Sequence, residues 1–231
     1  DEAMGGFASE IEGALLPNDM VRGVDNGRGI PVDVHKGTKV SALETVMTKL
    51  HAGGKFEGTA YKISGGLHGV GASVVNALSS WLKAEVYREG ARYFQEYKEG
   101  KKQFDVKKTK VKDEALHGTI VTFKADHTIF AETVYDWDRV VNHLRQQAYL
   151  VKKLRIRVID ARNIDPKIDL SSVFYLNELK LEVPSQTFYF EGGLLSLVKF
   201  YNLKQSPLHK NIFYAEKESG GVMVEIARQY V

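Results

Sequence analysis

A glycine-rich stretch in the first third of the chain constrains its fold more than any other feature. Four glycines fall between residues 65 and 71, and an apolar run of small residues follows, from 72 to 82. A glycine-rich loop that opens a helix presents bare backbone N–H groups and the positive end of the helix dipole, so it can wrap a phosphate group. The stretch lacks the Gly-Lys-Ser/Thr ending of a P-loop, and its glycine order differs from the Rossmann fingerprint. A flexible turn fits the same residues, and this segment alone does not decide between the two.

Composition narrows the class of protein. The chain has 231 residues, of which 43% are hydrophobic and 26% charged, as in an ordinary soluble globular protein. It has no cysteine, which excludes disulfides, thiolate metal sites and thiol nucleophiles. No apolar run approaches the roughly 18 residues of a membrane-spanning helix, and no signal peptide is visible, so we expect no membrane contact. Residue 1 is Asp, so we expect the chain to begin inside a longer protein.

The charge pattern leaves two interpretations open. The formal net charge is only +3, which does not by itself indicate nucleic-acid binding. Lysines nevertheless cluster between residues 98 and 112. Such a cluster is typical of a solvated hairpin, and a DNA-facing patch is the alternative.

Local patterns predict a mixture of helices and strands. The first four residues resemble the last turn of a helix stopped by Gly5-Gly6, and Ser41 and Glu44 form a capping box. We expect strands over 7–15 and 20–24, paired as a hairpin through the turn Pro17-Asn18-Asp19. Further predicted strands cover 83–88, 91–98, 103–106, 119–124, 154–160, 188–190 and 222–230, and predicted helices cover 42–50, 70–81, 137–149 and 194–203. Residues 163–184 receive no assignment. This order predicts an α+β two-layer sandwich.

Three further positions carry candidate chemistry. Asp25 stands at a strand end before Asn-Gly-Arg-Gly, where a carboxylate can accept a hydrogen bond from an exocyclic amine, although a simple Asp-Asn-Gly turn explains it as well. Lys55 follows two glycines and can place a positive charge on phosphate, or it is an ordinary surface lysine. His68 lies inside the glycine-rich loop without an accompanying nucleophile, so we expect its backbone N–H, not its ring, to act there.

Taken together, four segments stand in the order and at the spacing of one family. They are Asp1-Glu2-Ala3, the stretch from Asp25 to Pro31, the stretch Leu50-His51-Ala52-Gly53-Gly54-Lys55-Phe56, and residues 64–71. They resemble the ATPase region of the B subunits of bacterial type II topoisomerases, the family of DNA gyrase and topoisomerase IV, within the GHKL superfamily. The resemblance covers nearly the whole chain. It implies a Bergerat sandwich over residues 1–191, with a mixed sheet and helices on one face, and the beginning of a transducer domain over 192–231.

The resemblance assigns roles to individual residues. Asp25 would bind the adenine amine of ATP, with Gly29 and Thr119 completing a water network. Arg28 would lie over the purine beside Pro31 and pair with Glu2. The apolar side of the pocket would be formed by Ile30, Val46 and Met47. The triphosphate would be held by Lys55, Tyr61 and the backbone of Gly66, Leu67, His68, Gly69, Val70 and Gly71. Arg88 matches the pocket mouth where aminocoumarin antibiotics bind in this family, and residues 53–71 would form a lid that ATP orders.

The departures from the family pattern matter as well. The family motif places its general-base Glu and its Mg²⁺-binding Asn before the position of Asp1, so we expect no catalytic or metal-binding residue within residues 1–231, although ATP and Mg²⁺ are the implied ligands. The arm that clasps the partner subunit, and the transducer Gln and Lys, are likewise expected outside this range. Gly23 replaces a larger apolar residue, and the segment 163–187 is longer than is usual in the family.

The implied function is ATP binding and hydrolysis that drive DNA strand passage and supercoiling. The implied partners are DNA, the gyrase A subunit, a second gyrase B protomer once ATP binds, and aminocoumarin-type inhibitors, and the implied location is the cytoplasm. Three alternatives stay open: a topoisomerase IV B subunit, another GHKL enzyme such as a mismatch-repair ATPase, a heat-shock chaperone or a histidine kinase, and a GHKL nucleotide-binding module without turnover.

Overall fold

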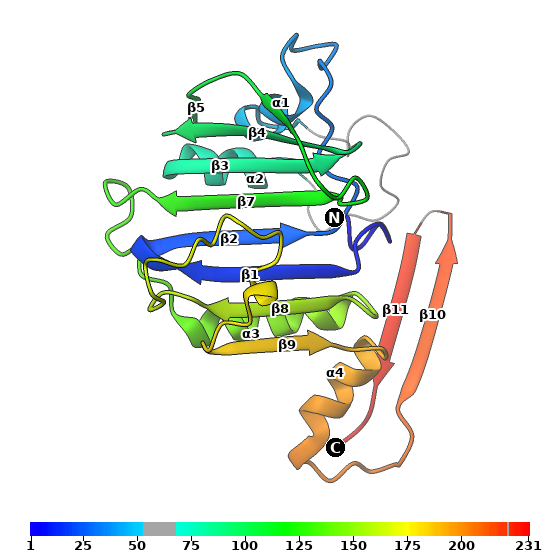
Figure 1. Ribbon diagram of the computed structural model, residues 1–231. Coiled ribbons are helices and arrows are strands. Elements are labelled where there is room, and N and C mark those ends of the chain that lie inside the picture. The colour runs from blue at the N-terminus through cyan, green and yellow to red at the C-terminus, as the bar shows by residue number, and fades with distance from the viewer. Residues whose placement is uncertain (53–67, 221) are drawn as a thin grey trace.

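A mixed β-sheet forms the body of the molecule (Figure 1). The computed structural model describes residues 1–52, 68–220 and 222–231. Within them, the strands follow the order β5-β4-β3-β7-β2-β1-β8-β9, and β6 also pairs with β4. Strands β1 and β8 run parallel, and the other pairs are antiparallel. The bounds are β1 Glu10–Leu16, β2 Met20–Asp25, β3 Ser79–Arg88, β4 Ala91–Lys98, β5 Lys101–Lys102, β6 Lys107–Lys110, β7 Gly118–Ala125, β8 Arg155–Asp160 and β9 Ser185–Tyr189.

The predicted hairpin of the first two strands is confirmed. The short 3-10 helix η1 (Pro17–Asp19) joins β1 to β2, and Asn18 and Asp19 take positive φ values of 61° and 60°. β1 begins only at Glu10, because the residues before it form a closing helical turn. The N–H of Phe7 donates to the carbonyl of Glu2 (2.8 Å), and Gly6 has a φ of +78°. This is the hydrogen-bond pattern with which glycine ends a helix, as the sequence predicts.

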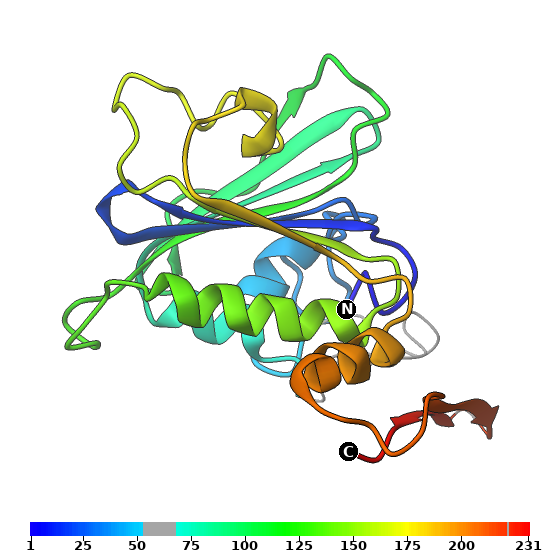
Figure 2. The ribbon, with the colours of Figure 1, turned by 90° about the horizontal axis from the view of Figure 1, so that it is seen from below.

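Three helices cover one face of the sheet, as Figure 2 shows. They are α1 (Ala42–Thr48), α2 (Gly71–Ala77) and α3 (Trp137–Leu150). Ser41 caps α1, its hydroxyl accepting the N–H of Glu44 at 3.0 Å. Leu43 and Met47 of α1 pack on Leu82, Ala84 and Val86 of β3. On the same face of the sheet, α3 packs on β8. The cluster between them contains Val141, Ala148, Ile156 and Val158.

The predicted helix over residues 70–81 is wrong in its extent. α2 ends at Ala77, and β3 already begins at Ser79, which pairs with Ala125 of β7. Leu82 is almost fully buried in the core between β3 and α1. The small apolar residues from 72 to 82 are compatible with a helix or a strand. Pairing with β7 makes the residues from Ser79 onward a strand.

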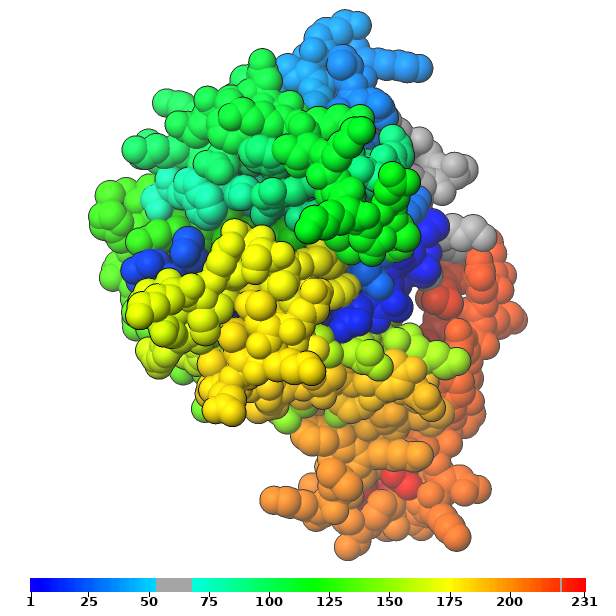
Figure 3. Space-filling model, viewed as in Figure 1, coloured from blue at the N-terminus to red at the C-terminus, as the bar shows by residue number. Residues whose placement is uncertain are grey.

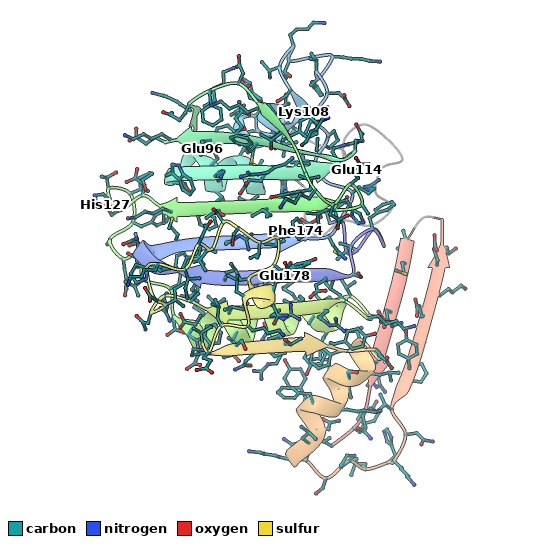
Figure 4. All side chains as sticks on the ribbon, in the orientation of Figure 1. Glu96, Lys108, Glu114, His127, Phe174 and Glu178 are labelled. Carbon is teal, nitrogen blue, oxygen red and sulfur yellow. The ribbon has the colours of Figure 1, made fainter. Side chains whose placement is uncertain are left out.

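The lysine-rich region forms an exposed edge of the sheet. The predicted strand over 103–106 is wrong, because β5 and β6 on either side of that segment pair with β4 instead. All four residues of β6 are exposed, and Figure 4 labels Lys108 at this edge. Lys107 and Lys108 lie over the rings of Phe104 and Tyr93. Lysines on an edge strand also oppose edge-to-edge association of sheets, and contact with DNA stays a prediction.

Residues 163–184, for which local patterns predict no element, cross the opposite face of the sheet. We call this segment the strap; it appears in yellow in front of the sheet in Figure 3. It contains the 3-10 helix η2 (Leu176–Leu179). Its apolar residues pack on the outward side chains of β1 and on the end of β8. The members of that cluster are Ala14, Leu16, Ile159, Ala161 and Leu176, with Met20, Ile164, Leu170, Val173, Leu179, Leu181 and Val183 around them. The sheet is therefore covered on both faces at its centre.

The last forty residues form a helix and a two-stranded hairpin that follow the main sheet. Helix α4 (Leu194–Tyr201) and the 3-10 helix η3 (Asn202–Lys204) lead to a hairpin of β10 (Phe213–Ser219) and β11 (Val222–Arg228). The hairpin lies beside the main sheet without pairing to it (Figure 1). A boundary near residue 191 accords with this arrangement and stays a proposal. Among the helices of the described residues, none is both long and apolar enough to cross a membrane.

Candidate functional site

The candidate site lies where β2 ends, at Asp25. In the sheet register Asp25 stands opposite Thr119 of β7 and Ile11 of β1. Arg22 and Val24 contact the strap, so strand alternation directs Asp25 to the helix-covered face. Ile120 of β7 faces the strap, so the preceding residue, Thr119, lies on the helix-covered face together with Asp25. A buried hydroxyl and a half-buried carboxylate are therefore brought together on one side of the sheet.

Electrostatics distinguish Asp25 from an ordinary surface aspartate. Burial raises the pKa of its carboxyl above the usual value of 3.8, and the nearby charge of Glu2 acts in the same direction. The N–H of Gly27 donates to Oδ1 at 2.8 Å and lowers the pKa, but does not cancel the effect of burial. Among the described residues, only part of the acceptor capacity of this carboxylate is used, and the remainder can receive a donor from a ligand.

The turn after Asp25 is fixed by its own side chains and glycines. Asn26 Oδ1 accepts the N–H groups of Ser9 and Glu10, both at 2.9 Å, which ties the turn to the start of β1. Gly29 has a φ of +76°, and a Cβ placed there would lie 2.9 Å from Val86 Cγ1. Only glycine combines that backbone conformation with that close approach. Asn26 and Gly29 are therefore required by the turn itself.

Arg28 is held at the rim of the site by Glu2. Its backbone N–H and its Nη2 donate to the two oxygens of the Glu2 carboxylate, at 2.7 and 2.8 Å, and its Nε donates at 3.2 Å. The guanidinium also lies 3.5 Å from the centre of the Phe7 ring. The ion pair that the family resemblance implies is thus present, whereas its role toward a purine stays a prediction.

An apolar wall continues the site toward α1. Ile30 is partly buried against the cluster of Leu43, Met47 and Val86. Met47 is itself buried in that core at 1% exposure, so it supports the wall, whereas the neighbouring Val46 is half-buried. The exposed Pro31 follows Ile30 in a segment without regular structure. Ile30 and Met47 belong to one apolar cluster, whereas the roles of Pro31 and Val46, and the contact of all four residues with a base, stay predictions.

The predicted phosphate-binding residues fall only partly within the described residues. Lys55, Tyr61, Gly66 and Leu67, and most of the predicted lid over 53–71, lie outside them. His68 is exposed, and its carbonyl accepts a hydrogen bond from His51 Nδ1 at 2.9 Å. Gly69 has a φ of +60°, Val70 caps α2, and Gly71 is the first residue of that helix. The described end of the glycine-rich stretch, Gly69 to Gly71, therefore opens a helix, as the sequence predicts.

Arg88 is the last residue of β3, beyond the pairing of Val86 with Thr119. It shares the helix-covered face with Ala84 and Val86, and its guanidinium pairs with Glu89 at 3.0 Å. This places it at the same end of the sheet as Asp25.

Sequence reasoning missed two residues of this site. His117 Nδ1 donates to the carbonyl of Gly27 at 2.7 Å, and Gly118, at a φ of +138°, lies directly against the backbone of Asp25. His117 and Gly118 stand just before the predicted strand over 119–124. The glycine at 118 was the sequence feature that could have indicated a close backbone approach there. The strap residue Phe174, which packs on Gly118, carries no such signal.

Metal binding is not assigned to any described residue. Across residues 1–52, 68–220 and 222–231, no three or more His, Asp or Glu side chains come together as a metal site would require. The Asp25 carboxylate, the Thr119 hydroxyl and Arg28, which is ion-paired with Glu2, suit a ligand with hydrogen-bond donors and a flat ring.

Comparison with known proteins defines the class. Residues 18–129 match the family described as histidine kinase-, DNA gyrase B- and HSP90-like ATPases. A crystal structure of the 43K ATPase domain of Thermus thermophilus gyrase B in complex with an aminocoumarin superimposes with a TM-score of 0.78 at 30% identity, covering 98% of this chain and 52% of that one. In this α+β fold, with its site at the end of β2, the chain is similar to the GHKL ATPases.

Within that class, the whole chain is similar to DNA gyrase B. It is 43% identical over 231 residues to the gyrase B protein of Treponema denticola, 44% to that of Treponema pallidum and 40% to that of Staphylococcus aureus. In each comparison all of this chain is covered, but only 33% of the relative, so the chain spans about a third of the length of these proteins. The region it matches is the ATPase region.

Proposed function

We propose that this chain binds ATP at the Asp25 end of the sheet, as part of the ATP-hydrolysing gyrase B component of a DNA gyrase. The observation that carries the proposal is the pairing of Asp25 with Thr119 on the helix-covered face. A carboxylate accepts hydrogen bonds and an amine donates them, so Asp25 suits the 6-amino group of adenine. The match of residues 18–129 to ATPases of this class supports the same ligand.

The surrounding residues suit a purine in this position. Gly29 and Thr119 flank Asp25, and Ile30, Pro31, Val46 and Met47 supply the apolar side. Arg28, which Glu2 and Phe7 already hold in place, offers a flat guanidinium that can stack on a ring. The triphosphate would run toward the start of α2, where the backbone from Gly66 to Gly71, with Lys55 and Tyr61, is predicted to bind it.

Mg²⁺ is typical of ATP hydrolysis and would supply charge stabilisation at the phosphates. Since the described residues offer no metal cluster, we assign it no ligand here. The hydrolytic base is likewise unassigned, and the residues of this chain act by binding and orienting the nucleotide.

The role of the whole protein follows from the relatives as a proposal. ATP binding and hydrolysis would drive DNA strand passage, with DNA, a gyrase A subunit and a second gyrase B protomer as partners, in the cytoplasm. The solved relative from Thermus thermophilus holds an aminocoumarin. We propose that this chain binds that class of inhibitor too, with Arg88 at the mouth of the pocket.

Calorimetric titration of the full chain with ATP tests the adenine site. Asp25→Asn replaces the acceptor by an amide that presents a donor to the adenine amine. Loss of a charge-assisted hydrogen bond is worth about 1.5–3 kcal/mol, so affinity should fall about 10- to 150-fold. Asp33→Asn makes the same chemical change at an exposed position and should leave affinity unchanged. Equal affinities of wild type and Asp25→Asn would contradict the proposal.

A further inference from the structure

The strap is attached to the sheet by two buried side chains of opposite charge. Glu12 of β1 accepts the N–H groups of Leu176 and Asn177, at 2.6 and 3.1 Å. Arg22 of β2 donates through Nη2 to the carbonyls of Val173 and Phe174, at 2.8 and 3.0 Å. Glu12 is 1% exposed and Arg22 4%. Buried charges hold their partners tightly because an unpaired one is costly, so the backbone on both sides of Phe174 is fixed to β1 and β2.

This attachment fixes the position of the Phe174 ring. The ring is buried against Val24 and Ile120, and it meets Tyr87 and Tyr175 edge-on, with centroids 5.1 and 4.9 Å away. Figure 4 labels Phe174 on the strap, in front of the sheet. A ring packed on four sides has little freedom to move. It therefore acts as a rigid surface on the outer face of β2 and β7.

Gly118 lies between that ring and the candidate adenine site. A Cβ built on Gly118 would overlap the carbonyl oxygen of Asp25, and it would lie 2.8 Å from Phe174 Cζ and 3.1 Å from Asn26 Cα. The next residue along β7 is Thr119, which pairs with Asp25. Any outward movement of Gly118 would therefore run into the Phe174 ring. The same movement would draw Thr119 away from its position beside Asp25.

We propose that Phe174 is a positioning residue that sets the selectivity of the site for adenine, by pressing Gly118 against Asp25 from the opposite face of the sheet. This inference rests on the proposed function. Phe174 touches no ligand, since the sheet lies between them, and its effect passes through Gly118 to the Asp25–Thr119 pair. Recognition of an amine by one carboxylate depends on the direction of the hydrogen bond. If the Asp25–Thr119 pair is held less firmly, the site therefore discriminates less well between bases.

The test compares ATP with inosine triphosphate, in which an oxygen replaces the 6-amino group. The readout is the ratio of the two dissociation constants, measured by calorimetry on the full chain. A loss of stability alone does not change this ratio, provided that each variant is folded. Phe174→Ala should reduce the preference for ATP by about tenfold, a typical size for coupling through packed residues. Phe174→Leu, which keeps apolar bulk but not the ring, should give a smaller reduction and serves if Phe174→Ala does not fold.

Leu181→Ala is the matched control. Leu181 packs on the same face, in the cluster around Leu16 and Ile159, at a part of the strap away from Gly118. It should destabilise the strap and leave the ATP preference at its wild-type value. An unchanged preference in both Phe174 variants, or an equal loss in Leu181→Ala, would overturn the inference. A wild-type chain without any preference for ATP would instead overturn the proposed function itself, which keeps the two failures distinct.

Discussion

Gly118 of β7 lies so close to Asp25 of β2 that there is no room for a side chain between them. A Cβ on Gly118 would overlap the Asp25 carbonyl oxygen, and the Gly118 φ of +138° is one that other residues rarely adopt. Such contacts are held only when the surrounding structure leaves no alternative. Here β2, β7 and the strap meet at one point.

The first prediction concerns that contact. Gly118→Ala should lower the free energy of unfolding by about 2–4 kcal/mol, because the methyl group clashes with backbone and the φ value is unfavourable. Gly23→Ala is the control in the neighbouring strand, since a Cβ there meets nothing within 4 Å. That control should be neutral or stabilise the chain by about 0.5 kcal/mol. Urea unfolding of both variants measures the difference, and equal stabilities would contradict the geometry.

The second prediction concerns the pH dependence of stability. Burial raises the pKa of Asp25 in the folded chain, so the folded state binds this proton more tightly than the unfolded state. The resulting stabilisation is complete below the ordinary pKa of 3.8 and is lost as pH rises through the raised value. Asp25→Asn stays neutral at every pH and keeps an acceptor for the Gly27 N–H.

Asp25→Asn should therefore be more stable than wild type at neutral pH, and this difference should shrink as pH falls toward 3.8. The same variant is expected to bind ATP poorly, so stability and function would change in opposite directions. Urea unfolding across this pH range checks the trend. A variant that is less stable than wild type at neutral pH would show that the ionised carboxylate is stabilising.

The third prediction concerns the attachment of the strap. Glu12→Ala removes the acceptor for two N–H groups and leaves Arg22, 3.8 Å from the Glu12 carboxylate, as a buried charge with one partner fewer. Breaking a buried pair in this way typically costs about 3–5 kcal/mol. Glu12→Gln keeps one acceptor oxygen and should cost less. Chemical unfolding distinguishes them, and a loss below about 1 kcal/mol in Glu12→Ala, typical of surface pairs, would mean that the strap is held by apolar packing alone.

The fourth prediction concerns the C-terminal hairpin. Lys152, just after α3, pairs with Glu216 of β10 at 2.8 Å and with Glu225 of β11 at 3.1 Å, and it also contacts the Tyr214 hydroxyl. Lys152→Ala should speed amide hydrogen exchange in β10 and β11. Lys153→Ala is the control, because Lys153 is a lysine in the same turn. Unchanged exchange in Lys152→Ala would mean that the hairpin does not depend on this contact.

The elements with local signals were predictable from sequence. Pro17-Asn18-Asp19 forms its turn from its own backbone preferences, Ser41 caps α1 with a hydrogen bond three residues away, and the spacing of Val140, Val141 and Leu144 defines one face of α3. The Asp25 turn belongs to this group. Its glycines are required by close approaches to Asp25, Glu2 and Val86, and although Glu2 and Val86 are remote in sequence, the glycines themselves are visible in it.

The strap was not predictable for the opposite reason. Its apolar residues follow no single period over the whole segment, although Leu179, Leu181 and Val183 alternate as in a strand, and their burial depends on partners remote in sequence. The hydrogen bond from Arg22 to the Phe174 carbonyl joins residues 152 positions apart. The end of α2 was missed for a related cause, because strand pairing with β7 overrides the preference of a small apolar run. The positions of β5 and β6 are likewise determined by pairing with β4. Their own lysine-rich sequence does not indicate them.

The most direct test of adenine recognition by Asp25 is a crystal structure of the full chain with a non-hydrolysable ATP analogue. We predict that the 6-amino group of adenine lies within hydrogen-bonding distance of the Asp25 carboxylate, about 2.7–3.2 Å, beside Thr119. We also predict that Phe174 stays packed on Gly118 behind the base. An adenine bound elsewhere, or bound here without contact to Asp25, would contradict this assignment.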